Sequence, residues 1–236
     1  MVVTEYVIKS KKVSSKYTFV MLSDMHNRSA AYVEAIKITS EIHPDAILVA
    51  GDLVDRHKKL SDLAVPFLRA CVEIAPTYFS YGNHESKYPI VSFQEFKESG
   101  AAVLYNAFVT ANPGNQNDAE FVIGGQHPNA DFAWLEEFEK SDTFKILLCH
   151  HPEYYPKFLK DRDVDLILSG HAHGGQIRIF NHGIFSPGQG LFPKYTKGLY
   201  DNKLIVGAGI SNTGGFIPRW GNPTEVLKIV VEPTVL

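Results

Sequence analysis

The chain has 236 residues, a formal net charge of −3 at pH 7, and 44% hydrophobic against 21% charged residues. This composition is typical of a globular protein with a well-buried core, and the slightly acidic balance excludes the basic surface that nucleic-acid binding requires. No apolar run approaches the ~18 residues that span a bilayer. The N-terminal "MVVTEYVIKSKK" also lacks the features of a secretory signal. We therefore expect a cytoplasmic protein without a transmembrane segment, with a peripheral position at a membrane as the alternative.

Two cysteines, Cys71 and Cys149, lie in apolar stretches and form no CxxC pair. We expect both to be reduced thiols in the core, as in cytoplasmic proteins. Near the start, the lysine-rich "KSKKVSSK" predicts a solvated hairpin or turn. The sequence does not indicate an oligomeric state.

The first half of the chain alternates β-rich apolar runs with helical patterns. Strands are predicted at 17–23, 46–50 and 77–82, and helices at 30–42, 60–74 and 91–99. Two further strands, 101–106 and 119–125, flank a polar loop at 110–118.

The second half contains one predicted helix, 132–140, for which Asp131 is a candidate cap. Its predicted strands are 145–149, 164–168, 176–180, 203–209 and 225–231. This half is richer in glycine and strands, so we expect more antiparallel pairing there. No repeat or linker divides the chain, which predicts an α/β fold with a single domain over residues 1–236.

Polar side chains follow five predicted strands at their C-terminal ends. They are Asp24 and His26, Asp52, Asn83 and His84, His150, and the pair His171 and His173. Open α/β sheets bind ligands beyond the carboxyl ends of their strands. If these strands are neighbours, the side chains meet in one cleft.

The combined set of oxygen and nitrogen donors contains no thiolate, which suits two transition-metal ions such as Mn, Fe or Zn. Asp52 is the natural bridging ligand, because one carboxylate can give an oxygen to each ion. The glycines before Asp52, Asn83 and His171 fit a backbone that bends sharply as it leaves the sheet. Each motif alone is as compatible with a helix cap or an exposed turn. Their order, each on its own strand, favours the metal site.

In this order the motifs "DMH", "GD", "GNHE", "CHHP" and "GHAH" resemble those of the calcineurin-like metallophosphoesterases. The resemblance extends over residues 17–232, and "GHAHGGQ" with the C-terminal tail is similar to the bacterial YkuE/YaeI-like subgroup. It implies a four-layer α/β/β/α sandwich with two mixed sheets. One departure is "FVIGGQHPN", where relatives more often carry a Gly-Val-Asp type of stretch. This departure bears on the substrate, not on the metal site.

The resemblance also implies roles for the metal ligands. The first ion would be held by Asp24, His26, Asp52 and His173. The second would be held by Asp52, Asn83, His150 and His171. Two divalent or trivalent ions can clamp a phosphate and activate a bridging hydroxide for in-line attack. Asp52 is therefore a catalytic as well as a metal-binding candidate.

His84 is the candidate that assists the leaving group. Asn83, His84, Arg28 and Arg219 are the candidates for substrate binding. Glu85 and Asp55 are expected either to orient the imidazoles or to act as helix-terminal acids.

We assign supporting, packing or surface positions to the remaining histidines and to two tyrosines. His151 either supports the ligands or merely precedes Pro152. Tyr154 and Tyr155 are expected to pack a helix. The histidines assigned to surface or loop positions are His43, His57, His127 and His182.

The favoured function is a dinuclear metal-dependent phosphoesterase acting on a small-molecule or lipid-linked phosphodiester or phosphomonoester. The alternative is a non-catalytic scaffold of the same fold that uses the cleft to bind protein. An amidohydrolase barrel or a β-lactamase-like fold fits less well, because their early HxH and HxHxDH patterns are incomplete here. Nucleotide-binding folds are excluded because neither a P-loop nor GxGxxG follows a strand.

Overall fold

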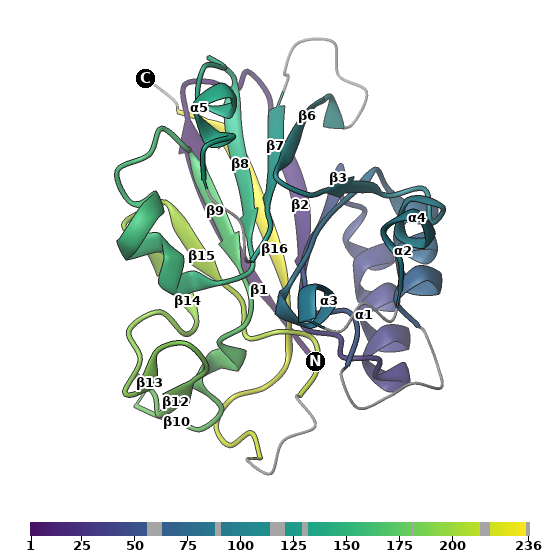
Figure 1. Cartoon of the computed structure of the whole chain (residues 1–236), viewed down its shortest axis with the longest axis vertical. Coiled ribbons are helices and arrows are strands. Elements are labelled where there is room, and N and C mark those ends of the chain that lie inside the picture. The colour runs from purple at the N-terminus through teal and green to yellow at the C-terminus, as the bar shows by residue number, and fades with distance from the viewer. Residues whose placement is uncertain are drawn as a thin grey trace.

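Two six-stranded mixed sheets stack face to face in the computed structural model, which describes residues 1–55, 63–87, 91–113, 121–128, 132–180, 182–212 and 218–234 (Figure 1). In order across the first sheet lie β1 (Val2–Ser10), β16 (Glu225–Pro233), β2 (Tyr17–Leu22), β3 (Ala46–Ala50), β4 (Thr77–Ser80) and β5 (Ala102–Leu104). In order across the second lie β14 (Gly198–Tyr200), β15 (Leu204–Val206), β9 (Leu166–Ser169), β8 (Phe144–Cys149), β7 (Phe121–Gln126) and β6 (Ala107–Ala111).

Parallel pairing dominates the centre of both sheets. Strands β2 to β5 run parallel in the first sheet, and β7, β8, β9 and β15 run parallel in the second. Antiparallel pairing, which we expected to be more frequent in the second half, occurs between β16 and β2 in the first sheet, at the edge strands β6 and β14 of the second sheet, and in two small hairpins. The centre is parallel because crossover segments with helical turns connect successive strands.

Helices cover the outer face of each sheet and complete four layers. On the first sheet these are α1 (Ser29–Ile42), α2 (Ala64–Ile74) and α4 (Phe93–Lys97), while α3 (Asn83–Lys87) follows β4 directly. On the second sheet they are α5 (Leu135–Phe138), the 3₁₀ turn η2 (Pro152–Tyr154) and the single-turn π-helix η3 (Tyr155–Leu159). The expected four-layer α/β/β/α sandwich is confirmed.

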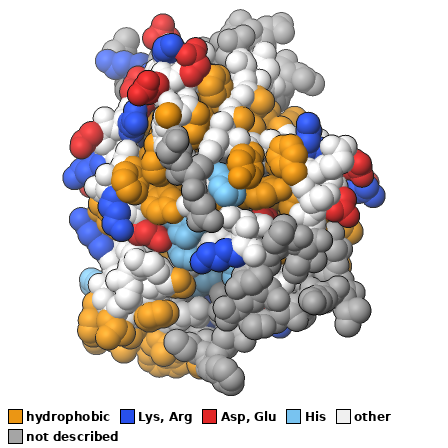
Figure 2. Space-filling model, viewed as in Figure 1, with side chains coloured by type: hydrophobic (Ala, Val, Ile, Leu, Met, Phe, Trp, Pro, Cys, Tyr) orange, Lys and Arg blue, Asp and Glu red, His pale blue; other side chains and the backbone are white. Residues whose placement is uncertain are grey.

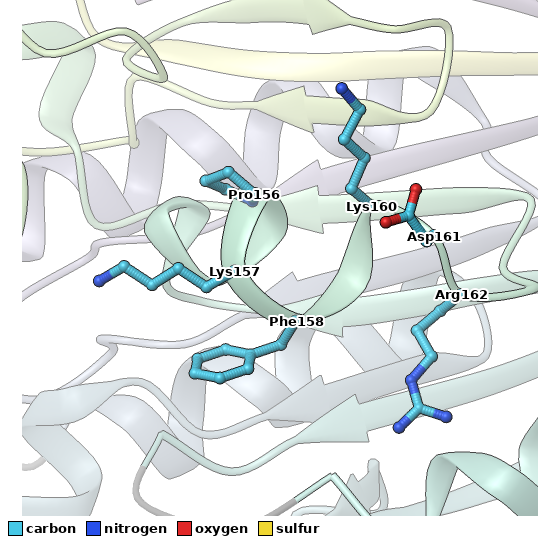
Figure 3. A pocket seen from close by; sticks show the side chains of 6 residues that line it. All are labelled: Pro156, Lys157, Phe158, Lys160, Asp161 and Arg162. Carbon is cyan, nitrogen blue, oxygen red and sulfur yellow. The ribbon is translucent and has the colours of Figure 1, made fainter.

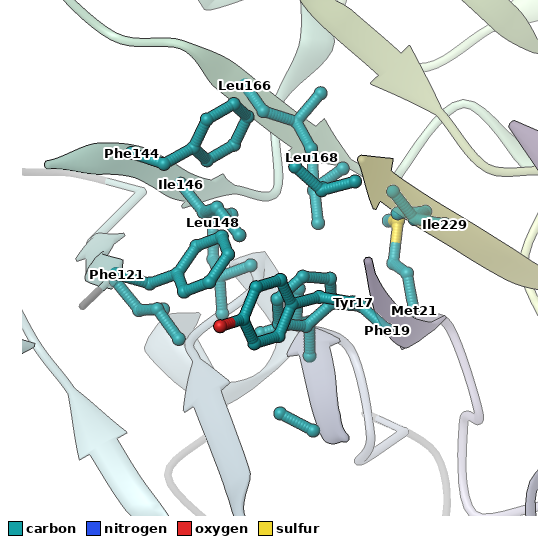
Figure 4. Packing of buried hydrophobic residues seen from close by; sticks show 14 of the residues in the cluster. Tyr17, Phe19, Met21, Phe121, Phe144, Ile146, Leu148, Leu166, Leu168 and Ile229 are labelled. Atoms are coloured by element: carbon teal, nitrogen blue, oxygen red, sulfur yellow. The ribbon is translucent and has the colours of Figure 1, made fainter. Parts of the chain in front are cut away.

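Alternation along the central strands explains the layering. On β2, Phe19 and Met21 face the second sheet, whereas Val20 and Leu22 face the helices. Figure 4 shows side chains of both sheets meeting between them, where the Phe121 ring lies 5.2 Å edge-on from that of Phe19. Strands buried on both faces read as continuous apolar runs, which is how the sequence revealed them.

The structure adds elements that the sequence did not predict. Edge strand β1 pairs in parallel with β16 along its whole length, although apolar and polar residue types do not alternate regularly in its sequence. Strand β6 pairs with β7 where a polar loop was expected to begin. The predicted strand 176–180 is shortened to β10 (Arg178–Ile179), which forms a hairpin with the unpredicted β11 (His182–Gly183) after the 3₁₀ turn η4 (His173–Gly175). A second unpredicted hairpin follows, β12 (Phe185–Ser186) with β13 (Gly190–Leu191).

Several smaller expectations can be checked directly. Cys71 and Cys149 are buried and free, as expected. Among the described residues, no helix is long and apolar enough to cross a membrane. Asp131, the candidate helix cap, and His57 lie outside the described residues.

Candidate metal centre

The predicted cluster of polar side chains forms at the carboxyl ends of five strands. Strands β2, β3 and β4 are parallel neighbours, as are β8 and β9, so their C-terminal loops meet along one edge. The loops also bond to one another: Asp24 N donates to Gly51 O at 3.0 Å, and His26 N donates to Asp52 O at 3.1 Å. Figure 2 shows pale-blue histidine side chains recessed near the middle of this face.

Asp24, His26 and His173 form one group of candidate ligands. The two imidazole Nε2 atoms lie 3.3 Å apart, and Asp24 Oδ1 lies 3.3 Å from His173 Nε2 and 3.8 Å from His26 Nε2. Ligand atoms held at 2.0–2.2 Å from one ion are separated by roughly 3.0–3.5 Å. The spacing therefore fits a metal ion between these three side chains.

Asp52, His150 and His171 form a second group. Asp52 Oδ2 lies 3.1 Å from His150 Nε2, and the candidate ligand atoms of all three residues lie within 4.8 Å of one another. His150 Nδ1 lies 2.6 Å from Ala50 O, to which it can only donate. This bond fixes the tautomer that leaves Nε2 available as a ligand.

Asp52 also lies within reach of the first group, because it shares a third cluster with His26 and His84. One carboxylate thus lies between the two sets of imidazoles. Asn83 begins α3 beside this carboxylate, and its buried Oδ1 has no hydrogen-bond partner among the described residues. An unpaired buried amide oxygen is costly, which favours a ligand there.

The backbone at these positions is strained in a consistent way. The residues with positive φ include Asp24 (59°), His26 (50°), Asp52 (56°), His171 (65°) and His173 (46°). Such conformations are uncommon for residues with side chains and concentrate at functional sites. We expected the glycines before the ligands to permit sharp bends, and Gly51 does so with φ 82°. Gly82 instead lets the Asp52 side chain approach the backbone, since a Cβ at residue 82 would lie 2.1 Å from Asp52 Oδ1.

Charge in the cluster is arranged to attract cations. Burial opposes ionisation of Asp24 and Asp52, but the imidazoles of His173 and His150 outweigh it and hold the pKa of both carboxyls below the usual range. Burial lowers the pKa of His173 to about 3 and keeps that of His171 well below its usual value. Against burial, Asp52 raises the pKa of His150 to about 10, so the carboxylate draws positive charge into the site.

His84 lies at the opening of this cluster. Its backbone N–H donates to Asp52 Oδ1 at 2.8 Å, and its Nε2 lies 3.9 Å from Asp52 Oδ2. Its side chain remains 17% exposed, whereas those of Asp24, His26 and His150 are at most 1% exposed. His84 can therefore meet a molecule that enters from solvent.

Glu85 does not orient the imidazoles. Its buried carboxylate accepts backbone N–H groups of Asp52, Leu53, Val54 and Gly82 at 2.7–3.0 Å. It thereby joins the loop after β3 to the loop after β4. Of the two roles that the sequence suggested, that of a helix-terminal acid is confirmed, because Glu85 lies in the first turn of α3 and accepts the Gly82 N–H. Its bonds to the loop after β3 could not be predicted, because nothing in the sequence reveals that the two loops present four amides to the same point. Asp55 is buried near His26 and His84, and its carboxylate favours the protonated form of both imidazoles.

Glu153 is a further carboxylate near the centre that was not identified from the sequence. Glu153 Oε1 lies 2.9 Å from His151 Nδ1 and 3.9 Å from His171 Nε2. His151 is thus tied to an acid beside a candidate ligand, and its ring stacks on Tyr154 at 5.0 Å. Tyr154 therefore packs against the centre, not only against a helix. An acid two residues after "HH" was the available signal.

The two arginines differ in position. Arg219 Nη2 donates to Ala208 O and Ser211 O and lies 3.2 Å from His173 Nδ1, while its buried Nε and Nη1 have no hydrogen-bond partner among the described residues. Arg28 lies at the N-cap of α1, where its backbone contacts Met25 and Tyr32. Only Arg219 contacts a candidate ligand.

Of the remaining described histidines, His43, His127 and His182 belong to none of the groups of candidate ligands. His43 caps α1 and His182 is exposed on β11, as expected. His127 follows β7 in a loop but is buried, with its ring 4.1 Å from that of Tyr105. A small hollow beside η3 contains none of the candidate ligands, and Figure 3 shows its lining side chains, such as Lys157 and Arg162, pointing in different directions.

Comparison with known proteins gives a consistent result. The family model of the calcineurin-like phosphoesterases matches residues 17–175. The chain is 29% identical to the metallophosphoesterase YkuE of Bacillus subtilis, over 89% of this chain and 78% of that protein. It is 28% identical to the phosphodiesterase YaeI of Escherichia coli, over 72% of this chain and 65% of that protein.

Other relatives extend beyond the chain. A metallophosphoesterase of Helicobacter pylori is 28% identical over 95% of this chain but only 60% of its own length. Among solved structures, TT1561 of Thermus thermophilus superposes with a TM-score of 0.51 at 16% identity, covering 83% of this chain and 90% of that one. This last likeness concerns the fold alone.

Proposed function

The chain belongs to the calcineurin-like phosphoesterase family, and from this premise we propose that it hydrolyses a phosphodiester or phosphomonoester with two metal ions. The observation that carries the proposal is the position of Asp52 between two groups of candidate ligands. Asp24, His26 and His173 would hold one ion with Asp52, and Asn83, His150 and His171 would hold the other with it. The oxygen and nitrogen donors suit Mn, Fe or Zn.

When bound, the ions supply activation of water for in-line attack and neutralisation of the charge that develops on the phosphate. The chain's own residues provide the geometry for this. Asp52 is fixed by the His84 N–H, and the Glu85 carboxylate holds the loop on which Asp52 lies. Positions that are fixed before the substrate arrives cost no reorganisation during the reaction.

The leaving group and the phosphate would be handled at the opening of the centre. His84 is the partly exposed imidazole beside Asp52, so it is placed to give a proton to the departing oxygen. Arg219, whose Nη1 has no partner among the described residues, would bind a phosphate oxygen beside His173. Arg28 remains a weaker candidate, since its observed contacts come from its backbone.

The substrate would be a small-molecule or lipid-linked phosphoester. The name of the relative YaeI, a phosphodiesterase, supports a diester. The cytoplasmic location and the single domain over residues 1–236 remain predictions. So does the absence of specific nucleic-acid binding.

Hydrolysis of bis-p-nitrophenyl phosphate tests the proposal. The metal-stripped protein is expected to be inactive and to regain turnover when Mn²⁺, Fe²⁺ or Zn²⁺ is added, because water is activated only at the occupied centre. Release of p-nitrophenol is followed by absorbance. A non-catalytic scaffold would bind the ions without releasing product, and that outcome would reject the enzyme.

A further inference from the structure

Six exposed apolar side chains form a surface beside the metal centre, which we call the apolar rim. It comprises Ile179, Phe180, Phe185, Leu191, Phe192 and Trp220, with exposures from 37% for Phe185 to 93% for Phe180. Figure 2 shows hydrophobic side chains gathered at the lower edge of the face, where Figure 1 labels β10, β12 and β13. Contiguous apolar surface of this kind marks an interaction site in a folded protein.

The two most exposed aromatic side chains of the rim occupy unfavourable backbone positions. Phe180 has φ 47° and Phe192 has φ 51°, values that favour glycine or asparagine. Phe180 and Phe192 are 93% and 77% exposed, so neither ring is buried in compensation. The strained backbone at Phe180 and Phe192 would be compensated if both rings were buried in a binding partner.

The rim is fixed to the metal centre through several contacts. Arg178, on β10, donates through Nη1 to Gly174 O at 2.8 Å, and Asn222 Nδ2 donates to His173 O at 2.7 Å. A β-bridge joins Ile177 to Trp220, next to the arginine that contacts His173. The rim and the candidate ligands His171 and His173 therefore belong to one connected unit.

A basic side chain lies beside the rim. Of the five lysines and arginines in residues 166–224, all of them described, Lys197 pairs with Glu225, and Arg178, Lys203 and Arg219 donate to backbone carbonyls, so Lys194 is the one whose charge is available to a partner. Lys194, two residues after Phe192, is exposed and lies 5.2 Å from the centroid of the Tyr195 ring. Aromatic and aliphatic side chains beside basic ones are the composition of membrane-interface anchors.

We propose that the apolar rim binds an anionic lipid bilayer, with Phe180 and Phe192 inserted at the boundary between headgroups and acyl chains. Lys194 would then lie among the headgroups. A consequence, which rests on the proposed function, is that the metal centre opens at the level of lipid phosphates. The substrate class would be a phosphoester of a lipid headgroup.

Co-sedimentation with vesicles tests the proposal without using hydrolysis. The protein is expected to bind vesicles of phosphatidylcholine and phosphatidylglycerol, and to bind phosphatidylcholine alone more weakly. The double variant F180S/F192S should weaken binding at least ~10-fold, because each buried ring contributes ~1.5–3 kcal/mol. Far-UV circular dichroism verifies that the variant is folded.

A matched control removes exposed apolar side chains elsewhere. Val33 on α1 and Phe158 on η3 are 68% and 50% exposed, so V33S/F158S should bind vesicles as the parent protein does. Equal binding by F180S/F192S, or no binding by the parent protein, would overturn the proposal. So would a dimer in sedimentation velocity that dissociates in F180S/F192S, because a second copy would then cover the rim. Vesicle binding by a protein that hydrolyses no phosphoester would reject only the proposed function.

Discussion

Replacing Asp52 by asparagine is expected to abolish turnover of bis-p-nitrophenyl phosphate. Asn keeps the size of the side chain and can still accept the His84 N–H at Oδ1, but it removes the negative charge that lies between two groups of imidazoles. One proposed ion then loses the oxygen ligand from residue 52, and the other keeps at most a neutral amide oxygen in place of a carboxylate. We expect kcat/KM to fall at least ~1,000-fold, equivalent to ~4 kcal/mol of transition-state stabilisation. The variant should also retain less than one ion per chain by elemental analysis.

Asp201 offers a matched control for this substitution. It has φ 51°, close to the 56° of Asp52, so Asn meets the same backbone conformation at both positions. Its Oδ2 accepts the Tyr155 hydroxyl at 2.9 Å, a bond that an amide oxygen can also make. D201N is therefore expected to keep full metal content and turnover. Full activity in D52N would refute the bridging role.

Replacing His84 by asparagine should lower kcat while leaving the metal content intact. The imidazole is the partly exposed one at the opening, and positioned proton donors contribute ~10²–10⁴-fold. The backbone N–H of residue 84 still donates to Asp52 Oδ1, so the ligand geometry is preserved. Steady-state kinetics and elemental analysis of the same preparation measure both quantities.

His43 serves as the control for that variant. It caps α1 with φ 51°, a conformation that asparagine adopts readily, and it is not among the candidate ligands. H43N is expected to match the parent protein in kcat. Loss of ions in H84N would instead make His84 a ligand, since it also clusters with His26 and Asp52. An unchanged kcat in H84N would remove it from the reaction.

The sequence was most informative where strands are buried on both faces. Each central strand reads as an apolar run, and a polar residue directly after it marks the edge at which ligands collect. Asp24, Asp52 and His171 could therefore be placed at one edge before any coordinates. Edge strand β1 carries no such run, because one of its sides is exposed and its pairing partner, β16, lies more than 200 residues away.

Residues that support the centre were harder to predict. Glu85 binds four backbone amides from two loops, a relation that appears only once β3 and β4 are side by side. Glu153 reaches His151 and His171 for a similar reason. The apolar rim was also missed, because exposed and buried aromatic residues read alike in a sequence that lacks periodicity.

The metal content of the purified chain, measured by inductively coupled plasma mass spectrometry after loading with Mn²⁺, Fe²⁺ or Zn²⁺ and removal of excess ions, decides whether the clustered carboxylates and imidazoles form a dinuclear centre. We predict two ions per chain. A chain that retains none, or that saturates at one, would contradict the account.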